Sequence, residues 1–242
     1  MQAIKIEALT KKYRDTVAVN GLSLSIEEGE LFSLLGVNGA GKTTTIKMLC
    51  CLTEPTDGDA FLFGHSIRTE AAAVKSIIAL SPQETAVAPA LTVEENLELI
   101  CGIYAFSKEK TEEKITSLSS LLSLSEVMKK KAGKLSGGYA RRLSIAMALI
   151  SEPKILFLDE PTLGLDVIAR SELWDVIEAL KGKVTVILTT HYMEEAEALS
   201  DRIAIMKDGE LLTVATPDEL KINTDTNSVE AAFIKIVKEE KR

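Results

Sequence analysis

The amino-acid sequence predicts an α/β protein with a mostly parallel sheet and a separate helical lobe. Short continuous apolar runs alternate with helical patterns along most of the chain, whereas one long internal stretch has helical patterns without a strand. A glycine-rich loop directly follows one of the apolar runs, as expected where a strand leads into a helix. At 242 residues the chain can bury a full hydrophobic core.

Composition and charge exclude several classes of protein. Hydrophobic residues make up 46% of the chain and charged residues 26%, which is typical of a globular domain. The net charge of -8 argues against general binding to nucleic acid or anionic lipid, because both require a basic face. The 3 cysteines lack CxxC spacing, which argues against a zinc site or a disulfide framework.

The N-terminus and the apolar stretches indicate a cytoplasmic protein without a membrane span. Residues 1–7 alternate like a strand and lack the apolar segment of a secretory signal. The most apolar long stretch, Ile145–Leu158, is interrupted by Glu152, Pro153 and Lys154. It therefore falls short of the roughly 20 apolar residues that a membrane helix needs.

Several apolar runs without alternating polar residues predict strands buried on both faces, as in a parallel sheet. These runs are Leu31–Leu35, Ile77–Leu80, Ile155–Leu158 and Val184–Leu188. Helical patterns lie between them, so helices should cover both faces of the sheet. Towards the end, residues 203–214 form the pattern of a β-hairpin that turns at Asp208-Gly209, and residues 228–242 form a charged helical tail.

The stretch from Thr92 to about Ile150 predicts a helical lobe inserted into the sheet domain. It opens with a capping box, in which Thr92 is followed three residues later by Glu95. The apolar face expected for the helix that follows consists of Val93, Leu97, Ile100, Cys101 and Tyr104.

The loop from Gly36 to Thr43 matches the phosphate-loop pattern GxxxxGK[ST] and lies between a predicted strand and a helical run. Its glycines would let backbone N–H groups point at phosphates, Lys42 would add a positive charge, and the Thr43 hydroxyl would bind magnesium. The residues assigned to the nucleotide are Gly36, Asn38, Gly39, Ala40, Gly41, Lys42, Thr43 and Thr44. The alternative is an ordinary glycine turn before a helix, which the flanking elements make the weaker interpretation.

An acidic pair follows another predicted strand. Asp159 and Glu160 come directly after Leu158, and a phosphate loop requires a carboxylate to hold magnesium opposite Thr43. Asp159 is the candidate magnesium ligand, and Glu160 is the candidate general base for an attacking water. Taken alone, the acidic pair could equally be an ordinary strand end without a function. The presence of the phosphate loop favours roles in magnesium binding and catalysis.

Candidate ligand-binding residues follow four of the predicted strands, namely Gly36, Gln83, Asp159 and His191. In an open α/β sheet, ligands bind beyond the carboxyl ends of the parallel strands, so these residues should gather at one edge. His191 is therefore a candidate contact to phosphate or water, although a lone histidine more often lies at a helix start or on the surface.

The segment Leu135-Ser136-Gly137-Gly138 precedes a predicted helix that Ser136 can cap. The simplest interpretation is an ordinary helix start. Arginines 141 and 142 in its opening turns oppose the helix dipole, however, and an anion bound at the N-terminus would offset that cost.

Together these motifs closely resemble the ATP-binding subunits of ATP-binding cassette (ABC) transporters. The resemblance spans about Ile4–Leu220 in the family's motif order. It rests on the phosphate loop, Gln83, Leu135 to Gly138, Asp159-Glu160, Leu165-Asp166 and His191. One departure is Tyr139, which stands where many members carry glutamine. The resemblance implies a P-loop NTPase core with a mostly parallel sheet, N-terminal antiparallel strands and an inserted α-helical subdomain.

The resemblance also implies which residues contact ATP. Tyr13 is similar to the aromatic residue that stacks on adenine in the family. Ser136, Gly137 and Gly138 are similar to the segment that binds the γ-phosphate of ATP held by the opposite subunit. Two ATP molecules would then lie between two subunits arranged head to tail.

Three further roles come from the resemblance. Gln83 is similar to the residue that contacts magnesium and couples to the membrane partner. Asp166 is similar to the residue that communicates between the two sites, and His191 to the histidine that holds the γ-phosphate.

The resemblance implies a set of ligands, partners and domains. The ligands are ATP and Mg²⁺, and the partners are a transmembrane permease and a second ATP-binding subunit, with a homodimer sufficient. The location is peripheral, on the cytoplasmic face of the cell membrane. Residues 189–197 and the short tail most resemble ABC-2 type exporters. The expected division is an ATP-binding core of residues 1–90 and 151–220, a helical signature-motif lobe of residues 91–150, and a C-terminal helical tail of residues 221–242.

Two other functions fit part of the sequence. A soluble, non-transport ABC ATPase acting on DNA or ribosomes usually needs a long coiled coil or two cassettes in one chain, and the acidic net charge argues against nucleic acid. A GTPase or small-molecule kinase would share only the phosphate loop. No Asn-Lys-x-Asp motif is present for reading a guanine base, and a kinase would leave Ser136 to Gly138 unexplained.

Overall fold

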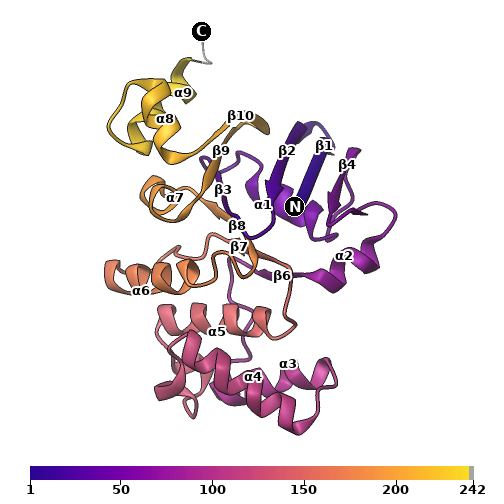
Figure 1. Cartoon of the computed structure of the whole chain (residues 1–242), viewed down its shortest axis with the longest axis vertical. Coiled ribbons are helices and arrows are strands. Elements are labelled where there is room, and N and C mark those ends of the chain that lie inside the picture. Colours follow the sequence, from indigo (N-terminus) through magenta and orange to yellow (C-terminus); the bar gives the residue numbers. More distant parts are fainter. Residues whose placement is uncertain (240–242) are drawn as a thin grey trace.

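The computed structural model describes residues 1–239 and contains two sheets and a set of helices (Figure 1). The strands are β1 (Gln2–Tyr13), β2 (Thr16–Glu27), β3 (Leu31–Leu35), β4 (Asp57–Leu62), β5 (His65–Ser66), β6 (Ile78–Ser81), β7 (Ile155–Asp159), β8 (Thr185–Thr190), β9 (Arg202–Lys207) and β10 (Glu210–Ala215). The α-helices are α1 (Lys42–Leu49), α2 (Ala71–Ile77), α3 (Val93–Ile103), α4 (Lys108–Leu121), α5 (Gly137–Leu149), α6 (Val167–Glu178), α7 (Met193–Leu199), α8 (Pro217–Thr224) and α9 (Val229–Glu239). Short 3-10 helices span Ser125–Val127 and Ala132–Lys134.

The larger sheet has the strand order β10-β9-β3-β8-β7-β6. Strands β9, β3, β8, β7 and β6 pair in parallel, and β10 pairs antiparallel with β9 as a hairpin. The smaller sheet is antiparallel, with the order β2-β1-β4-β5. The predicted parallel sheet, C-terminal hairpin and N-terminal antiparallel strands are therefore confirmed.

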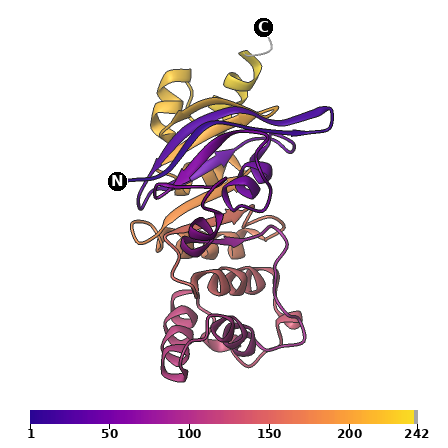
Figure 2. The same ribbon diagram turned by 90° about the vertical axis from the view of Figure 1, so that its right-hand side faces the viewer.

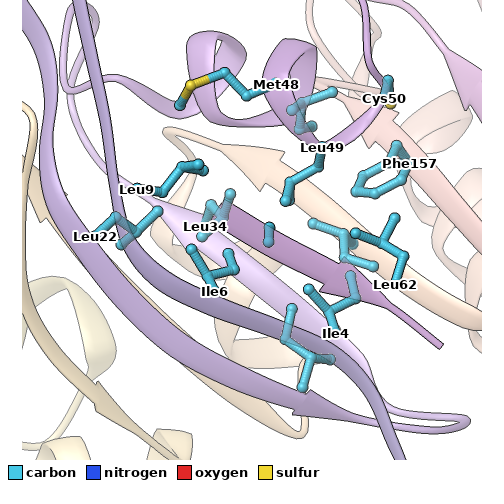
Figure 3. Close-up of a cluster of buried hydrophobic side chains, with 14 of the residues drawn as sticks. Ile4, Ile6, Leu9, Leu22, Leu34, Met48, Leu49, Cys50, Leu62 and Phe157 are labelled. Carbon is cyan, nitrogen blue, oxygen red and sulfur yellow. The ribbon is translucent and has the colours of Figure 1, made fainter. Parts of the chain in front are cut away.

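Side chains of the parallel strands alternate between two hydrophobic cores, because successive residues of a strand point to opposite faces. Phe157 belongs to the core shared with the antiparallel sheet and α1, whereas its neighbours Leu156 and Leu158 belong to the core shared with α5, α6 and the helical lobe. Figure 3 shows the first of these cores, to which Leu9 and Leu22 of the antiparallel sheet and Met48 and Leu49 of α1 belong. Each fully buried large side chain contributes about 1.5–3 kcal/mol to folding.

The helical lobe consists of α3, α4 and α5 and lies at one end of the molecule (Figures 1 and 2). Its capping box is confirmed, since the Thr92 hydroxyl accepts a hydrogen bond from the Glu95 N–H at 3.2 Å and the Glu95 carboxylate accepts one from the Thr92 N–H at 2.7 Å. Tyr104, the last residue of the expected apolar face, is the C-terminal cap of α3 and is 50% exposed. The helix ends there because Ala105 adopts a left-handed conformation, with φ 53°.

The C-terminal helices pack on the sheet domain as a third core. Val229, Ala232 and Phe233 of α9 are buried together with Leu220 of α8. The expected tail is thus helical but amphipathic, and residues 240–242 of that prediction lie outside the described residues. Within residues 1–239 no helix has the length and apolar character needed to cross a bilayer.

Candidate nucleotide-binding site

The phosphate loop joins β3 to α1 and is held closely by distant parts of the chain. A Cβ atom at Gly36 would lie 2.5 Å from the carbonyl oxygen of Met206, and one at Gly41 would lie 2.5 Å from that of Ala18. The Gly209 N–H, in the turn between β9 and β10, also donates a hydrogen bond to a carbonyl of the loop at 3.2 Å. Two glycines of the motif are therefore required because β2 and the β9–β10 hairpin leave no room for a side chain.

The start of α1 is suited to binding an anion. Gly41 caps the helix with φ 102° and no side-chain hydrogen bond, so no cap side chain occupies the N–H groups of the first turn. Lys42 is 4% exposed, and its ammonium donates hydrogen bonds to the carbonyls of Gly36 at 2.7 Å and Val37 at 3.2 Å. Burial lowers the pKa of Lys42, and the carboxylate of Glu160, 3.6 Å from the ammonium, opposes that shift.

Two hydroxyl groups converge on one carboxylate oxygen at the end of β7. Thr43 Oγ1 donates to Asp159 Oδ1 at 3.2 Å, and Thr189 Oγ1 donates to the same oxygen at 2.5 Å. Gln83 lines the same pocket as Thr43. Hydroxyl, carboxylate and amide oxygens are the hard ligands that Mg²⁺ prefers, so this donor set fits a magnesium ion beside bound phosphates.

Thr189 is a residue of the site that the sequence interpretation missed. Its hydroxyl also accepts a hydrogen bond from the Glu160 N–H at 3.0 Å, so one side chain fixes both members of the acidic pair. Glu160 adopts a left-handed conformation with φ 46°, which costs of order 1–3 kcal/mol and directs its side chain towards the pocket. His191 Nδ1 lies 3.2 Å from Glu160 Oε2. The available signal was a hydroxyl residue at the end of a buried apolar strand, two positions before His191.

A pocket of ≈ 490 Å³ gathers most of the expected nucleotide-binding residues. It is lined by Tyr13, Ala18, Asn38, Gly39, Ala40, Gly41, Lys42, Thr43, Thr44, Gln83, Glu160, Leu163 and His191. Tyr13 ends β1 and is 45% exposed, so its ring is accessible to a ligand. The strand ends therefore converge as expected, with Gly36 and Asp159 directly behind the lining residues.

The remaining expected residues lie outside this pocket. Ser136 caps α5, with its hydroxyl accepting a hydrogen bond from the Tyr139 N–H at 3.5 Å, and both Ser136 and Gly137 are exposed. A Cβ atom at Gly138 would lie 3.1 Å from Cβ of Ala169, so α5 packs closely on the start of α6. Asp166 caps α6 by accepting hydrogen bonds from two backbone N–H groups at 3.0 Å.

Comparison with known proteins identifies the family. A family model described as "ABC transporter" matches residues 19–163. The chain is 39% identical over 227 residues to the daunorubicin/doxorubicin resistance ATP-binding protein DrrA of Streptomyces peucetius, which covers 93% of this chain and 69% of DrrA. A solved dimer of the ATP-binding cassette MJ0796, bound to ADP and Pi, superposes with a TM-score of 0.79 at 28% identity and covers 88% of this chain and 98% of that one.

A longer relative shows the same similarity over part of its length. The Probable multidrug ABC transporter ATP-binding protein YbhF of Escherichia coli (strain K12) is 38% identical over 240 residues, which is 97% of this chain and 41% of YbhF. The chain thus spans less than half of that relative. The family expected from the motifs is confirmed, and the chain belongs to the ABC transporter family.

Proposed function

We propose that this chain hydrolyses ATP as one of two paired subunits that power an ABC exporter, most similar to the ABC-2 type. The observation that carries this proposal is the pocket in which the phosphate loop, Gln83, Glu160 and His191 meet. The similarity to DrrA, a drug-resistance protein, favours an exporter. ADP and phosphate in the related MJ0796 dimer support hydrolysis.

The pocket supports a role for each of its elements in hydrolysis. Tyr13 would stack on adenine, while the loop N–H groups and Lys42 would hold the phosphates. Magnesium, held by Thr43, Asp159 and Gln83, would neutralise phosphate charge. Glu160 would take a proton from a water whose oxygen bonds to the γ-phosphorus as the bond to the β–γ bridging oxygen breaks. This releases ADP and inorganic phosphate.

His191 would act next to Glu160. Its Nδ1 lies 3.2 Å from the Glu160 carboxylate, which leaves the other ring nitrogen for a γ-phosphate oxygen. The histidine would thereby fix both the direction of the carboxylate and the terminal phosphate, which is why it is proposed as part of the catalytic set.

A second copy of the chain would complete the site. Ser136 and Gly137 are exposed at the start of α5, outside the pocket of their own chain. They lie at a helix N-terminus, which attracts anions. The related MJ0796 cassette forms a dimer. In a head-to-tail pair, Ser136, Gly137 and Gly138 of one copy would meet the γ-phosphate in the other, and Asp166 beside them would lie between the two sites.

The permease would dock on an apolar groove next to Gln83. This groove has a volume of ≈ 350 Å³ and is lined by residues of β6, α3 and α5 and by residues that directly follow them, including Pro82, Ile103, Tyr104 and Met147. Ile103 is 69% exposed and Tyr104 50% exposed, so these neighbouring apolar side chains are available to a partner. Docked in this way, the chain would lie on the cytoplasmic face of the membrane. Its proposed parts are an ATP-binding core of residues 1–90 and 151–220, a helical lobe of residues 91–150 and a C-terminal helical tail of residues 221–242.

Replacing Ile103 by glutamate tests the transport function. The chain should sediment with membranes of the cells that express it, and Ile103→Glu should lower the bound fraction at least about tenfold, because a buried isoleucine is worth roughly 1.5–3 kcal/mol. Phosphate release from ATP by the purified variant should not change. Ile222→Glu is the matched control, since Ile222 is 76% exposed on α8, far from the groove in sequence. Wild-type chain that stays in the supernatant would favour a soluble ABC ATPase instead.

Replacing Tyr13 by alanine tests adenine stacking. The Michaelis constant for ATP should rise about tenfold while the turnover number changes little, because stacking on a base is worth roughly 1–3 kcal/mol and lies far from the reacting phosphate. Tyr13→Phe keeps the ring and should behave like the wild type. Steady-state kinetics of phosphate release measures both constants. A fall in turnover at an unchanged Michaelis constant would argue against this role.

A further inference from the structure

Arg141 of α5 is a buried cation held mainly by backbone carbonyls. Its side chain is 4% exposed, and its two terminal nitrogens donate hydrogen bonds to the carbonyl oxygens of Pro82 and Gln83, each at 2.5 Å. Within residues 1–239 no ion pair joins this guanidinium to a carboxylate. Burial lowers the pKa of Arg141, and the charges of Asp159 and Glu195 oppose that shift. The two carbonyl oxygens and the negative charges of Asp159 and Glu195 therefore stabilise the buried positive charge of Arg141, although neither carboxylate forms an ion pair with it.

The segment that Arg141 holds contributes to two different pockets. It follows β6, the edge strand of the parallel sheet. Gln83 lines the nucleotide pocket, whereas its neighbour Pro82 lines the apolar groove beside α3 and α5. Adjacent residues thus line different pockets, and Arg141 of the helical lobe binds the backbone carbonyls of both. A second contact, between the hydroxyls of Ser81 and Ser144 at 2.9 Å, joins the end of β6 to α5.

The neighbouring arginine provides an internal comparison. Arg142 lies on the same helix, is 5% exposed, and forms an ion pair with Glu172 of α6. Its guanidinium lies 5.3 Å from the ring of Tyr139. Arg141 and Arg142 therefore match in chemistry, burial and helix, but only Arg141 binds the segment that contains Gln83.

We propose that Arg141 is a positioning residue that holds the backbone of the Gln83 segment against α5 and so sets how far the Gln83 side chain reaches into the pocket. This inference rests on the proposed role of Gln83 as a ligand of magnesium. The planar guanidinium presents two N–H groups in a fixed fork that matches two adjacent carbonyls, and a lysine ammonium cannot reproduce that geometry. Arg141 would thus set where the amide oxygen of Gln83 meets the cation.

Arg141→Lys is the informative variant, because it keeps the positive charge near Asp159 and removes only the two-point grip. We expect its turnover of ATP to fall about tenfold, the effect of losing one charge-assisted hydrogen bond. The Mg²⁺ concentration for half-maximal rate should rise several-fold, whereas ATP binding without Mg²⁺ should stay as in the wild type. Arg142→Lys is the control and should leave the Mg²⁺ dependence unchanged. Thermal unfolding shows whether Arg141→Lys is folded. If it is not, Arg141→Gln, which can donate to one carbonyl, takes its place in the same measurements.

A double-mutant cycle with Gln83→Ala separates positioning from a general loss of structure. If Arg141 acts through Gln83, Arg141→Lys should cause no further loss of turnover once Gln83 is alanine. An independent, additive loss, or an unchanged Mg²⁺ dependence in Arg141→Lys, would overturn the inference about Arg141 alone. If Gln83→Ala itself changed neither rate nor Mg²⁺ dependence, the proposed role of Gln83 would be wrong, and the role of Arg141 with it. Absence of phosphate release by the wild-type chain would instead contradict the proposed function.

Discussion

Glu160→Gln should bind ATP as the wild type does, lose nearly all turnover, and accumulate as an ATP-bound dimer. The amide has almost the same shape as the carboxylate, which lies 3.6 Å from the Lys42 ammonium and 3.2 Å from His191. It cannot accept a proton from water, so the rate should fall by about 10²- to 10⁴-fold, the usual contribution of a positioned general base. Because ATP then persists, the two subunits should remain closed around it.

This result can be measured in two ways. Single-turnover release of phosphate gives the chemical rate, and size-exclusion chromatography with ATP gives the fraction of dimer. Glu194→Gln is a suitable control, because Glu194 is an exposed residue of α7 that does not line the pocket. Rapid hydrolysis by Glu160→Gln would rule out Glu160 as the base.

Ser136→Arg should impair hydrolysis even though Ser136 lies outside the pocket of its own chain. In a head-to-tail pair the arginine would occupy the position of the γ-phosphate bound by the other copy, so both sites of a homodimer would be blocked. The variant also loses the α5 cap, which costs about 0.5–2 kcal/mol, so its folding must be checked by thermal unfolding. Ser136→Thr keeps a capping hydroxyl and serves as the control.

Mixing with Lys42→Ala gives the decisive readout for a shared site. In a mixed pair, the phosphate loop of the Ser136→Arg chain meets the intact Ser136 of the Lys42→Ala chain, which leaves one complete site. Roughly half of the dimers in an equal mixture are mixed if pairing is random. ATP binding and hydrolysis should therefore partly recover on mixing, as measured by phosphate release. If mixed samples were as inactive as either variant alone, the two-subunit site would lose its main support.

Local sequence patterns predicted which helices and strands are present better than they predicted where these elements end or how the strands are ordered in the sheet. The run Leu31–Leu35 is a strand buried on both faces, as its composition indicated, and the hairpin around Asp208-Gly209 forms with the expected turn. Tyr104 continues the apolar period of α3 but lies past its end, because the turn at Ala105 is set by local backbone geometry that the period does not encode. The position of β3 between β9 and β8 depends on crossover connections, which no single run predicts.

In the candidate site, too, features encoded by neighbouring residues could be predicted, whereas features that depend on strand pairing could not. The phosphate loop and the acidic pair carry recognisable patterns, and parallel strands bring them to one edge for a general physical reason. The role of Thr189 could not be read in the same way, because it depends on the register that places β8 beside β7. The arginines after Ser136 suggested an anion at this helix start, but the γ-phosphate of a second subunit was expected only through resemblance to a family, since Ser136, Gly137 and Gly138 do not line the pocket of their own chain.

The walls that shape the phosphate loop also bear on how the chain folds during synthesis. The carbonyls that exclude a side chain at Gly41 and Gly36 come from Ala18, made before the loop, and Met206, made long after it. The Gly209 N–H that bonds to the loop is made later still. A chain emerging from the ribosome therefore carries the whole motif well before the residues that enclose it, and the phosphate loop can take its final form only after the β9–β10 hairpin has been made.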